Sequence, residues 1–202
     1  MRQRESTEKA PMTEEDLSLA ARNALPDALR VLVKEFPREA WDTDPNFSGL
    51  IRFWLDRHIG FRQLLGQMQR DVETVLDNGM EPFAYARSLA NRGGAFVNEL
   101  HGHHQIEDHH YFPLLEGLDA RVSRGFHLLD ADHHEIDALL HRFADAANGV
   151  LNKPQGGRGF TDLCAGFKVA LDATVPLLDR HLVDEEELVV PVLLKYAPPG
   201  LQ

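Results

Sequence analysis

The sequence predicts an all-α protein: an antiparallel up-down four-helix bundle with a short helical N-terminal extension. Three observations support this prediction. Apolar residues recur in steps of three and four along four long segments. Short stretches rich in glycine, asparagine and proline separate those segments. The sequence contains no sustained alternation rich in Val, Ile and Thr, which is the pattern of β-strands.

The composition limits the classes of function. A chain of 202 residues with 43% hydrophobic and 26% charged residues is long enough for one well-buried domain and short for two. The net charge of −11 argues against a nucleic-acid or membrane partner, because such surfaces depend on clustered Lys and Arg. The single cysteine, Cys164, excludes an internal disulfide, and we expect its thiol to be buried. Without an eighteen-residue apolar run or a signal-peptide core, the sequence favours a cytoplasmic location.

We divide the chain into an N-terminal extension, residues 1–46, and a bundle, residues 47–197. Residues 1 to about 12 are charged and polar, and we expect them to be disordered. Thr13, followed by three acidic residues, is typical of a helix N-cap. Pro26 then predicts two short helices or one kinked helix. We expect the extension to pack against the bundle, and its residues suggest no chemistry of their own.

Four long helices follow the extension. Asn78-Gly79 and Asn148-Gly149 are typical C-terminal stops, and Pro82 is typical of a first helical turn. The glycine-rich residues 152–159 predict a flexible loop. We therefore expect helices over about residues 48–78, 82–117, 119–147 and 160–197.

Each predicted helix has an apolar seam that becomes polar near its middle. The polar seam residues are His58 in the first helix, His103 and Glu107 in the second, His133 in the third, and His181 and Glu185 in the fourth. Burying imidazoles and carboxylates inside a bundle costs several kcal/mol unless they are paired or coordinated. A metal centre would satisfy all six, so we predict these residues as metal ligands.

The polar pattern also repeats along the chain. The spacing of His103, Glu107 and Pro113 recurs in His181, Glu185 and Pro191. Residues four apart lie about one turn apart on one helix face, so a histidine can bind one ion while the glutamate reaches the next. Two carboxylates that bridge two ions form a dinuclear site. A mixed imidazole and carboxylate set favours iron, with manganese or zinc as substitutes.

Several neighbouring residues are alternatives to these ligands. His104 and Asp108 have the same spacing one residue later, although the repeat favours His103. His134 lies next to His133 but off the apolar seam. His110 lies one turn beyond Glu107, and its participation stays open. We expect surface positions for His101, His109, His127 and His141, and a solvated face for the acidic residues 184–187, with Glu185 as the exception.

Over residues 48–196 the chain resembles the hemerythrin-like, or HHE cation-binding, family, on the strength of the six residues above in that order. The resemblance implies a non-haem centre of two iron ions with bridging carboxylates and an Fe–O–Fe bridge. It also implies reversible binding or sensing of dioxygen or another diatomic ligand, sometimes with peroxide chemistry. Oxygen-carrying members have a further histidine one turn before the third-helix histidine, where this chain has Leu129. This chain would then supply six protein ligands instead of seven and leave the iron more open. That difference favours a likeness to the sensor, iron-handling or peroxidase-like members of the family.

The sequence therefore predicts a di-iron protein that binds or senses dioxygen or a similar small ligand, with Trp54 and Leu129 as apolar lining. One alternative is an oxidase-like or peroxidase-like enzyme at the same centre. Another is a helical interaction module with a structural or vestigial metal site. No residue suggests a general acid or base, so the sequence assigns no catalytic residue. A ferritin-like site is disfavoured because the fourth helix has no histidine after Glu185.

Overall fold

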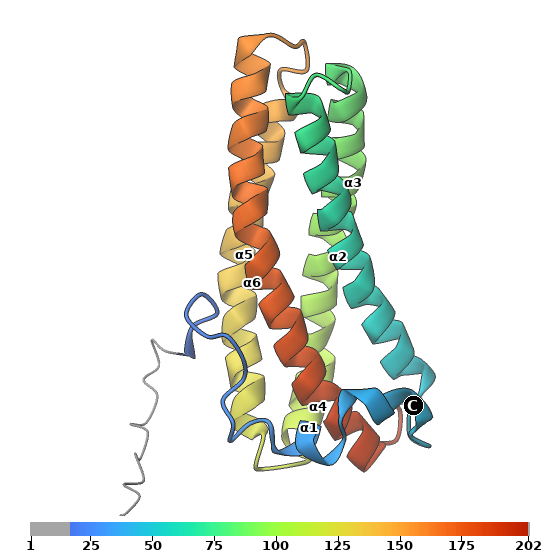
Figure 1. Ribbon diagram of the computed structural model, residues 1–202. Coiled ribbons are helices and arrows are strands. Elements are labelled where there is room, and N and C mark those ends of the chain that lie inside the picture. Colours follow the sequence, from blue (N-terminus) through green and yellow to red (C-terminus); the bar gives the residue numbers. More distant parts are fainter. Residues whose placement is uncertain (1–16, 202) are drawn as a thin grey trace, which may run out of the picture.

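The computed structural model of the protein describes residues 17–201 (Figure 1). Over this range the fold is all-α and contains no strand, which confirms the all-α part of the predicted fold class. The described residues form six α-helices, one 3-10 helix and one π-helical turn. The expectations for residues 1–12 and for a cap at Thr13 lie outside the described range. None of the helices within it is long and apolar enough to cross a membrane.

Four long helices make up the body of the protein. They are α2 (Gly49–Leu76), α3 (Pro82–Ile106), α5 (Ser123–Leu151) and α6 (Arg158–Tyr196). Helix α2 packs against α3 and α6, and α5 packs against the same two helices. Figure 1 shows the four helices lying side by side along the length of the molecule. Every long helix therefore has two long neighbours and buries one face between them.

Local sequence signals explain how α2 begins and ends. The Ser48 hydroxyl accepts a hydrogen bond from the backbone N–H of Ile51 at 3.3 Å, as an N-cap residue does. After Leu76, Asn78 has a left-handed φ of 59°, and the Gly79 N–H donates to the Thr74 carbonyl at 2.8 Å. The Asn-Gly stop is thus observed at this helix.

The core consists of two apolar clusters with a polar layer between them. One cluster contains Phe61, Phe96, Leu100, Ile136, Phe143, Phe167 and Leu182. The other contains Trp54, Phe112, Phe126, Leu129 and Leu188. Along α2, Trp54 belongs to the second cluster and Phe61 to the first, with buried His58 between them. Cys164 is buried in the first cluster, as expected.

The predicted second helix, residues 82–117, is divided in the structure. Helix α3 ends at Ile106, the π-helical turn η3 covers Glu107–Tyr111, and α4 covers Phe112–Glu116. A π turn holds one extra residue, so the face of the helix that is buried changes after it. A regular helical period would continue the buried seam from Glu107 to His110 and Leu114, but both of these side chains are exposed. The buried positions are instead Phe112, five residues after Glu107, and Leu115.

The ends of the third predicted helix were also wrong. Helix α5 begins at Ser123, and it continues through Asn148-Gly149 to Leu151. Val150 is fully buried in the core, so packing outweighs the low helix propensity of the Asn-Gly pair. The loop before α6 contains Gly156 and Gly157, both at a φ of +79°, a conformation that favours glycine.

The N-terminal extension packs across one end of the bundle (Figure 1). Its regular elements are α1 (Val31–Glu35) and the 3-10 helix η2 (Arg38–Thr43), and α1 contacts α6. Of its buried apolar side chains, Leu25, Leu29, Leu32 and Trp41 belong to the second core cluster, and Leu19 belongs to the first. The extension also buries Arg22, a charged residue to which the sequence analysis gave no role.

Candidate metal centre

Seven side chains from the four long helices and the π turn converge in the polar layer. The first donor set is His58, His103, Glu107 and Glu185, and the second donor set is His104, His133 and His181. Within each set the candidate ligand atoms lie within 4.8 Å of one another. All seven are buried except His103, whose side chain is 11% exposed. A compact group of this composition is able to hold metal cations.

The two glutamates connect the two donor sets. One oxygen of Glu107 lies 2.9 Å from His103 Nε2, and its other oxygen lies 3.7 Å from His133 Nε2. One oxygen of Glu185 lies 3.6 Å from His58 Nε2, and its other oxygen lies 3.4 Å from His181 Nε2. Each carboxylate therefore offers one oxygen to each set, which is what a pair of ions about 3.5–4 Å apart requires of bridging ligands.

Unpartnered polar atoms test whether the residues fit a metal. Within the described part of the chain, both oxygens of Glu107 and of Glu185 are buried and accept no well-aligned hydrogen bond, although His103 Nε2 lies 2.9 Å from one Glu107 oxygen. The same holds for His133 Nε2, His181 Nε2 and both ring nitrogens of His104. Buried polar groups without partners are costly and uncommon in folded proteins. Coordination of two cations would satisfy these atoms together, so the donor set fits a dinuclear metal centre.

Carboxylates outside the donor sets orient three of the histidines. The pairs are His58 Nδ1 with Glu186 at 3.0 Å, His133 Nδ1 with Asp108 at 2.6 Å, and His181 Nδ1 with Asp132 at 3.2 Å. A carboxylate on one ring nitrogen keeps the proton there and directs the other nitrogen to the metal. All three histidines accordingly present Nε2 to the centre.

The environment shifts the pKa values of the donors in both directions, and only the lowered values favour the deprotonated forms that bind metal. Burial lowers the pKa of His103 to about 3 and that of His104 well below its usual range, which keeps both imidazoles neutral. Burial also raises the pKa of Glu107, and the nearby Glu185 carboxylate raises it further. The pKa of Glu185 is lowered, because His58 and the other imidazoles outweigh the effect of burial. Although burial opposes it, Asp132 and Glu185 raise the pKa of His181 to about 9.

All six residues singled out in the sequence lie in the two donor sets. His104, which we treated as an alternative to His103, is present beside it. Successive residues point about 100° apart around a helix, so His103 reaches the first set and His104 the second. Asp108 is not a donor and instead contacts His133. His110 and His134 are exposed, as are His101, His109, His127 and His141.

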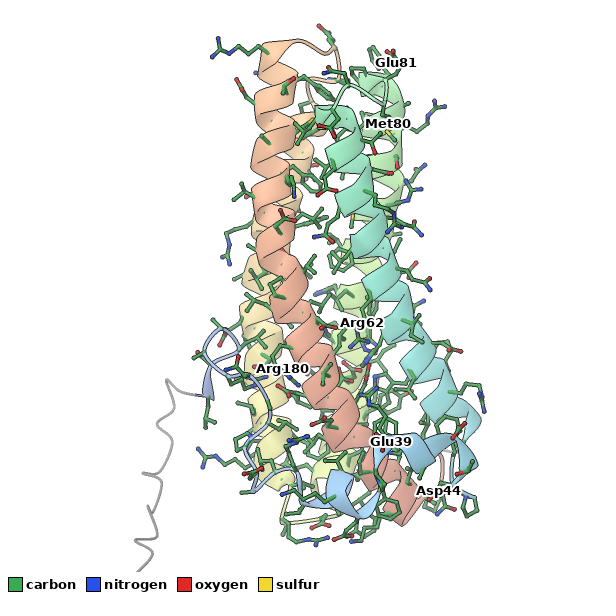
Figure 2. All side chains as sticks on the ribbon, viewed as in Figure 1. Glu39, Asp44, Arg62, Met80, Glu81 and Arg180 are labelled. Atoms are coloured by element: carbon green, nitrogen blue, oxygen red, sulfur yellow. The ribbon has the colours of Figure 1, made fainter. Side chains whose placement is uncertain are left out.

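The expectation of a solvated acidic face at residues 184–187 was wrong. Asp184, Glu185 and Glu186 have relative exposures of 0%, 1% and 4%. Arginines neutralise the two that are not donors: Asp184 pairs with Arg22, and Glu186 pairs with Arg62 at 2.9 Å. Figure 2 labels Arg62 on α2, and also Arg180 on α6, which donates to the Asn23 carbonyl of the extension at 2.6 Å.

Aromatic and aliphatic side chains enclose the centre. The Trp54 ring lies 6.4 Å from the His58 ring and 6.2 Å from the His103 ring, centroid to centroid. Phe112 stacks on His133 at 5.5 Å, and Leu129 is fully buried. Trp54 thus lies where an apolar lining was expected, and Leu129 belongs to the same apolar cluster as Trp54 and Phe112. Such a lining excludes water from the donors.

The helices and the two donor sets define a cation-binding all-α protein. The family model described as the hemerythrin HHE cation binding domain matches residues 49–193, well over half of the chain. The chain belongs to this family. No curated protein and no solved structure gives a significant match.

Proposed function

We propose that this protein is a non-haem di-iron protein that binds or senses dioxygen or another small diatomic ligand. In this proposal α2, α3, α5 and α6 form an antiparallel up-down four-helix bundle around the two ions. The observation that carries it is the position of Glu107 and Glu185, each with one oxygen near each donor set. Iron suits a set of imidazoles and carboxylates without thiolate, and manganese or zinc are possible substitutes. The cytoplasmic location stays a prediction.

The two donor sets differ in their number of histidines. The first set offers His58 and His103, and the second offers His104, His133 and His181. We propose that the small ligand binds on the side of the first set, where fewer protein atoms are available to coordinate. Trp54 lies against both histidines of that set, and its buried Nε1–H has no hydrogen-bond partner among the described residues. An N–H group at this place can donate to a small anionic ligand.

The chain's residues have separate tasks in this proposal. When bound, two iron ions supply the electrons that pass to and from the small ligand. The five histidines and two glutamates hold the ions, and the apolar lining keeps water out. The carboxylates of Glu186, Asp108 and Asp132 orient the rings of His58, His133 and His181.

The position of His104 weakens the enzymatic alternative, and the buried unpartnered atoms weaken the alternative of a vestigial metal site. The enzymatic alternative was motivated by Leu129, which suggested a missing ligand and a more open iron. His104 supplies a seventh donor, so that motive no longer holds. A vestigial site would not be expected to keep eight buried, unpartnered donor atoms.

Anaerobic reconstitution tests the proposal. Apo protein is loaded with ferrous iron, the bound iron is counted, and the diferrous protein is mixed with dioxygen in a stopped-flow spectrometer. We expect two ions per chain and an absorption change that reverses when dioxygen is removed. Rapid irreversible oxidation with peroxide consumption would favour the enzyme instead. A protein that binds no ferrous iron would exclude both.

A further inference from the structure

Two arginines of the N-terminal extension reach carboxylates that orient histidines of the metal centre. Both arginines, Arg22 and Arg38, precede the family match at residues 49–193. They differ in setting, because the Arg22 side chain is 1% exposed whereas that of Arg38 is 47% exposed. Figure 1 shows the extension running beside α5 and α6 toward the end of the bundle.

Arg22 holds the carboxylate behind His181. Its Nη1 donates to one oxygen of Asp132 at 2.7 Å, and its Nη2 contacts the other oxygen. That other oxygen lies 3.2 Å from His181 Nδ1. The Nε of Arg22 donates to Asp184 at 2.8 Å, so one buried guanidinium serves two buried carboxylates. A planar guanidinium fixes a carboxylate in a way that a lysine ammonium does not.

The extension is anchored around this arginine. The backbone N–H of Leu25 donates to Asp184 at 3.1 Å, and Arg180 pairs with the same carboxylate. Arg180 also donates to the Asn23 carbonyl at 2.6 Å. These contacts fix the backbone directly after Arg22, so its side chain has a defined approach to Asp132.

Arg38 occupies the equivalent position on the other side of the centre, but it contributes less to holding its carboxylate. It pairs with one oxygen of Glu186, whose other oxygen lies 3.0 Å from His58 Nδ1. Arg62 on α2 also donates to Glu186, at 2.9 Å. Glu186 is therefore held by the bundle as well as by the extension, whereas Asp132 has Arg22 as its arginine.

We propose that Arg22 is a positioning residue of the metal centre, which acts through Asp132 to fix the imidazole of His181. Arg38 acts in the same way on His58 through Glu186, with Arg62 as a partial substitute. The extension is then a part of the centre rather than a covering segment. This inference rests on the cation binding in the proposed function, and it does not depend on which small ligand binds.

The test uses Arg22→Lys and Asp132→Asn in the full chain, with Arg30→Lys as a matched control. Arg30 also joins the extension to α6, through Glu187 at 3.0 Å, but that pair touches no donor histidine. Cobalt(II) is the probe, because its absorption spectrum reports coordination. Competition with a chelator, well below the unfolding temperature of each variant, gives the affinity for each of the two ions.

We expect both Arg22→Lys and Asp132→Asn to weaken the binding of one of the two ions by about 10–100-fold and to change its spectrum. Arg38→Met alone should change the affinity for either ion less than about threefold. The double variant Arg38→Met/Arg62→Met should weaken the binding of the ion that Arg22→Lys leaves unaffected by about tenfold or more. Arg30→Lys should leave both affinities unchanged. If Arg22→Lys and Asp132→Asn lower the unfolding temperature but leave both affinities and the spectrum as in the wild type, the inference is wrong. A wild-type protein that binds no cobalt would instead overturn the metal site itself.

Discussion

Asp108 and Glu186 have equivalent places in the two halves of the bundle. Each directly follows the glutamate of a His-x-x-x-Glu turn, and each contacts Nδ1 of a histidine on a neighbouring long helix. Asp108 lies 2.6 Å from His133, and Glu186 lies 3.0 Å from His58. The internal repeat therefore includes the carboxylates that orient the histidines, not only the donors themselves.

Replacement of Asp108 by Asn tests this equivalence. An amide accepts less strongly than a carboxylate and leaves the His133 ring less firmly oriented. We expect the affinity for one metal ion to fall about 10–100-fold, measured by chelator competition with cobalt(II). Asp137→Asn is the control, because Asp137 lies on the same helix as His133 but near exposed His101. Equal affinities for Asp108→Asn and the control would remove the orienting role of Asp108.

His104 is expected to cost stability in the metal-free protein. Both of its ring nitrogens are buried without a hydrogen-bond partner in the described chain, and its ring stacks on His133 at 4.0 Å. The repeat places the buried Leu182 at the equivalent position of α6. We therefore expect His104→Leu to raise the free energy of unfolding of the apo protein by about 1–3 kcal/mol, measured with urea. The same change should weaken the binding of one metal ion by at least about tenfold.

His141→Leu serves as the control for this experiment, because His141 is exposed on α5. It should leave metal binding unchanged and should change the free energy of unfolding by no more than a few tenths of a kcal/mol. A His104→Leu protein that is less stable without metal, yet binds both ions normally, would show that His104 is a core residue and not a donor.

The sequence was sufficient to single out six of the residues that the structure brings together as candidate donors. His58 and His133 stand in otherwise apolar patterns of period 3.6, and burial of a polar residue there needs an explanation that a metal provides. His104 could not be found in this way, because it lies next to His103 and about 100° away from that seam. The sequence does contain a signal for the carboxylates that orient the histidines. An acidic residue, Asp108 or Glu186, directly follows each of the two glutamates.

Other features depend on tertiary contacts. The step of five from Glu107 to Phe112 comes from a π turn, which no periodic pattern predicts. The burial of Asp184 and Glu186 requires arginines that are 162 and 124 residues away along the chain, Arg22 and Arg62. Sequence spacing carries no information on such pairs, so the acidic run resembled a solvated face.

Removal of metal should lower the unfolding temperature. Ligand at about 100 times its dissociation constant adds about 2.7 kcal/mol to the stability of the folded state. For a chain of this size that corresponds to an increase of about 5–10 °C. Scanning calorimetry of cobalt-loaded and chelator-treated protein measures the difference. Glu185→Gln should abolish it, because Glu185 contacts donors of both sets. Identical transitions with and without bound cobalt would mean that the metal does not bind in the folded core.

The pH dependence of apo stability should depend on Glu186. Burial alone would raise the pKa of this carboxyl, but His58 and Arg62 lower it to about 2, from an ordinary value of 4.5. A carboxyl with a lowered folded-state pKa stabilises the protein fully above pH 4.5, and this contribution is lost as the pH falls toward about 2. Its size is on the order of 3 kcal/mol. We therefore expect the stability difference between wild type and Glu186→Gln to shrink steadily between pH 5.5 and pH 2.5, followed by urea unfolding of metal-free protein. Glu99→Gln, in an exposed pair with Arg57, should differ little from wild type at any pH. Parallel stability curves for wild type and Glu186→Gln would contradict the ionised, arginine-held Glu186 on which the orientation of His58 depends.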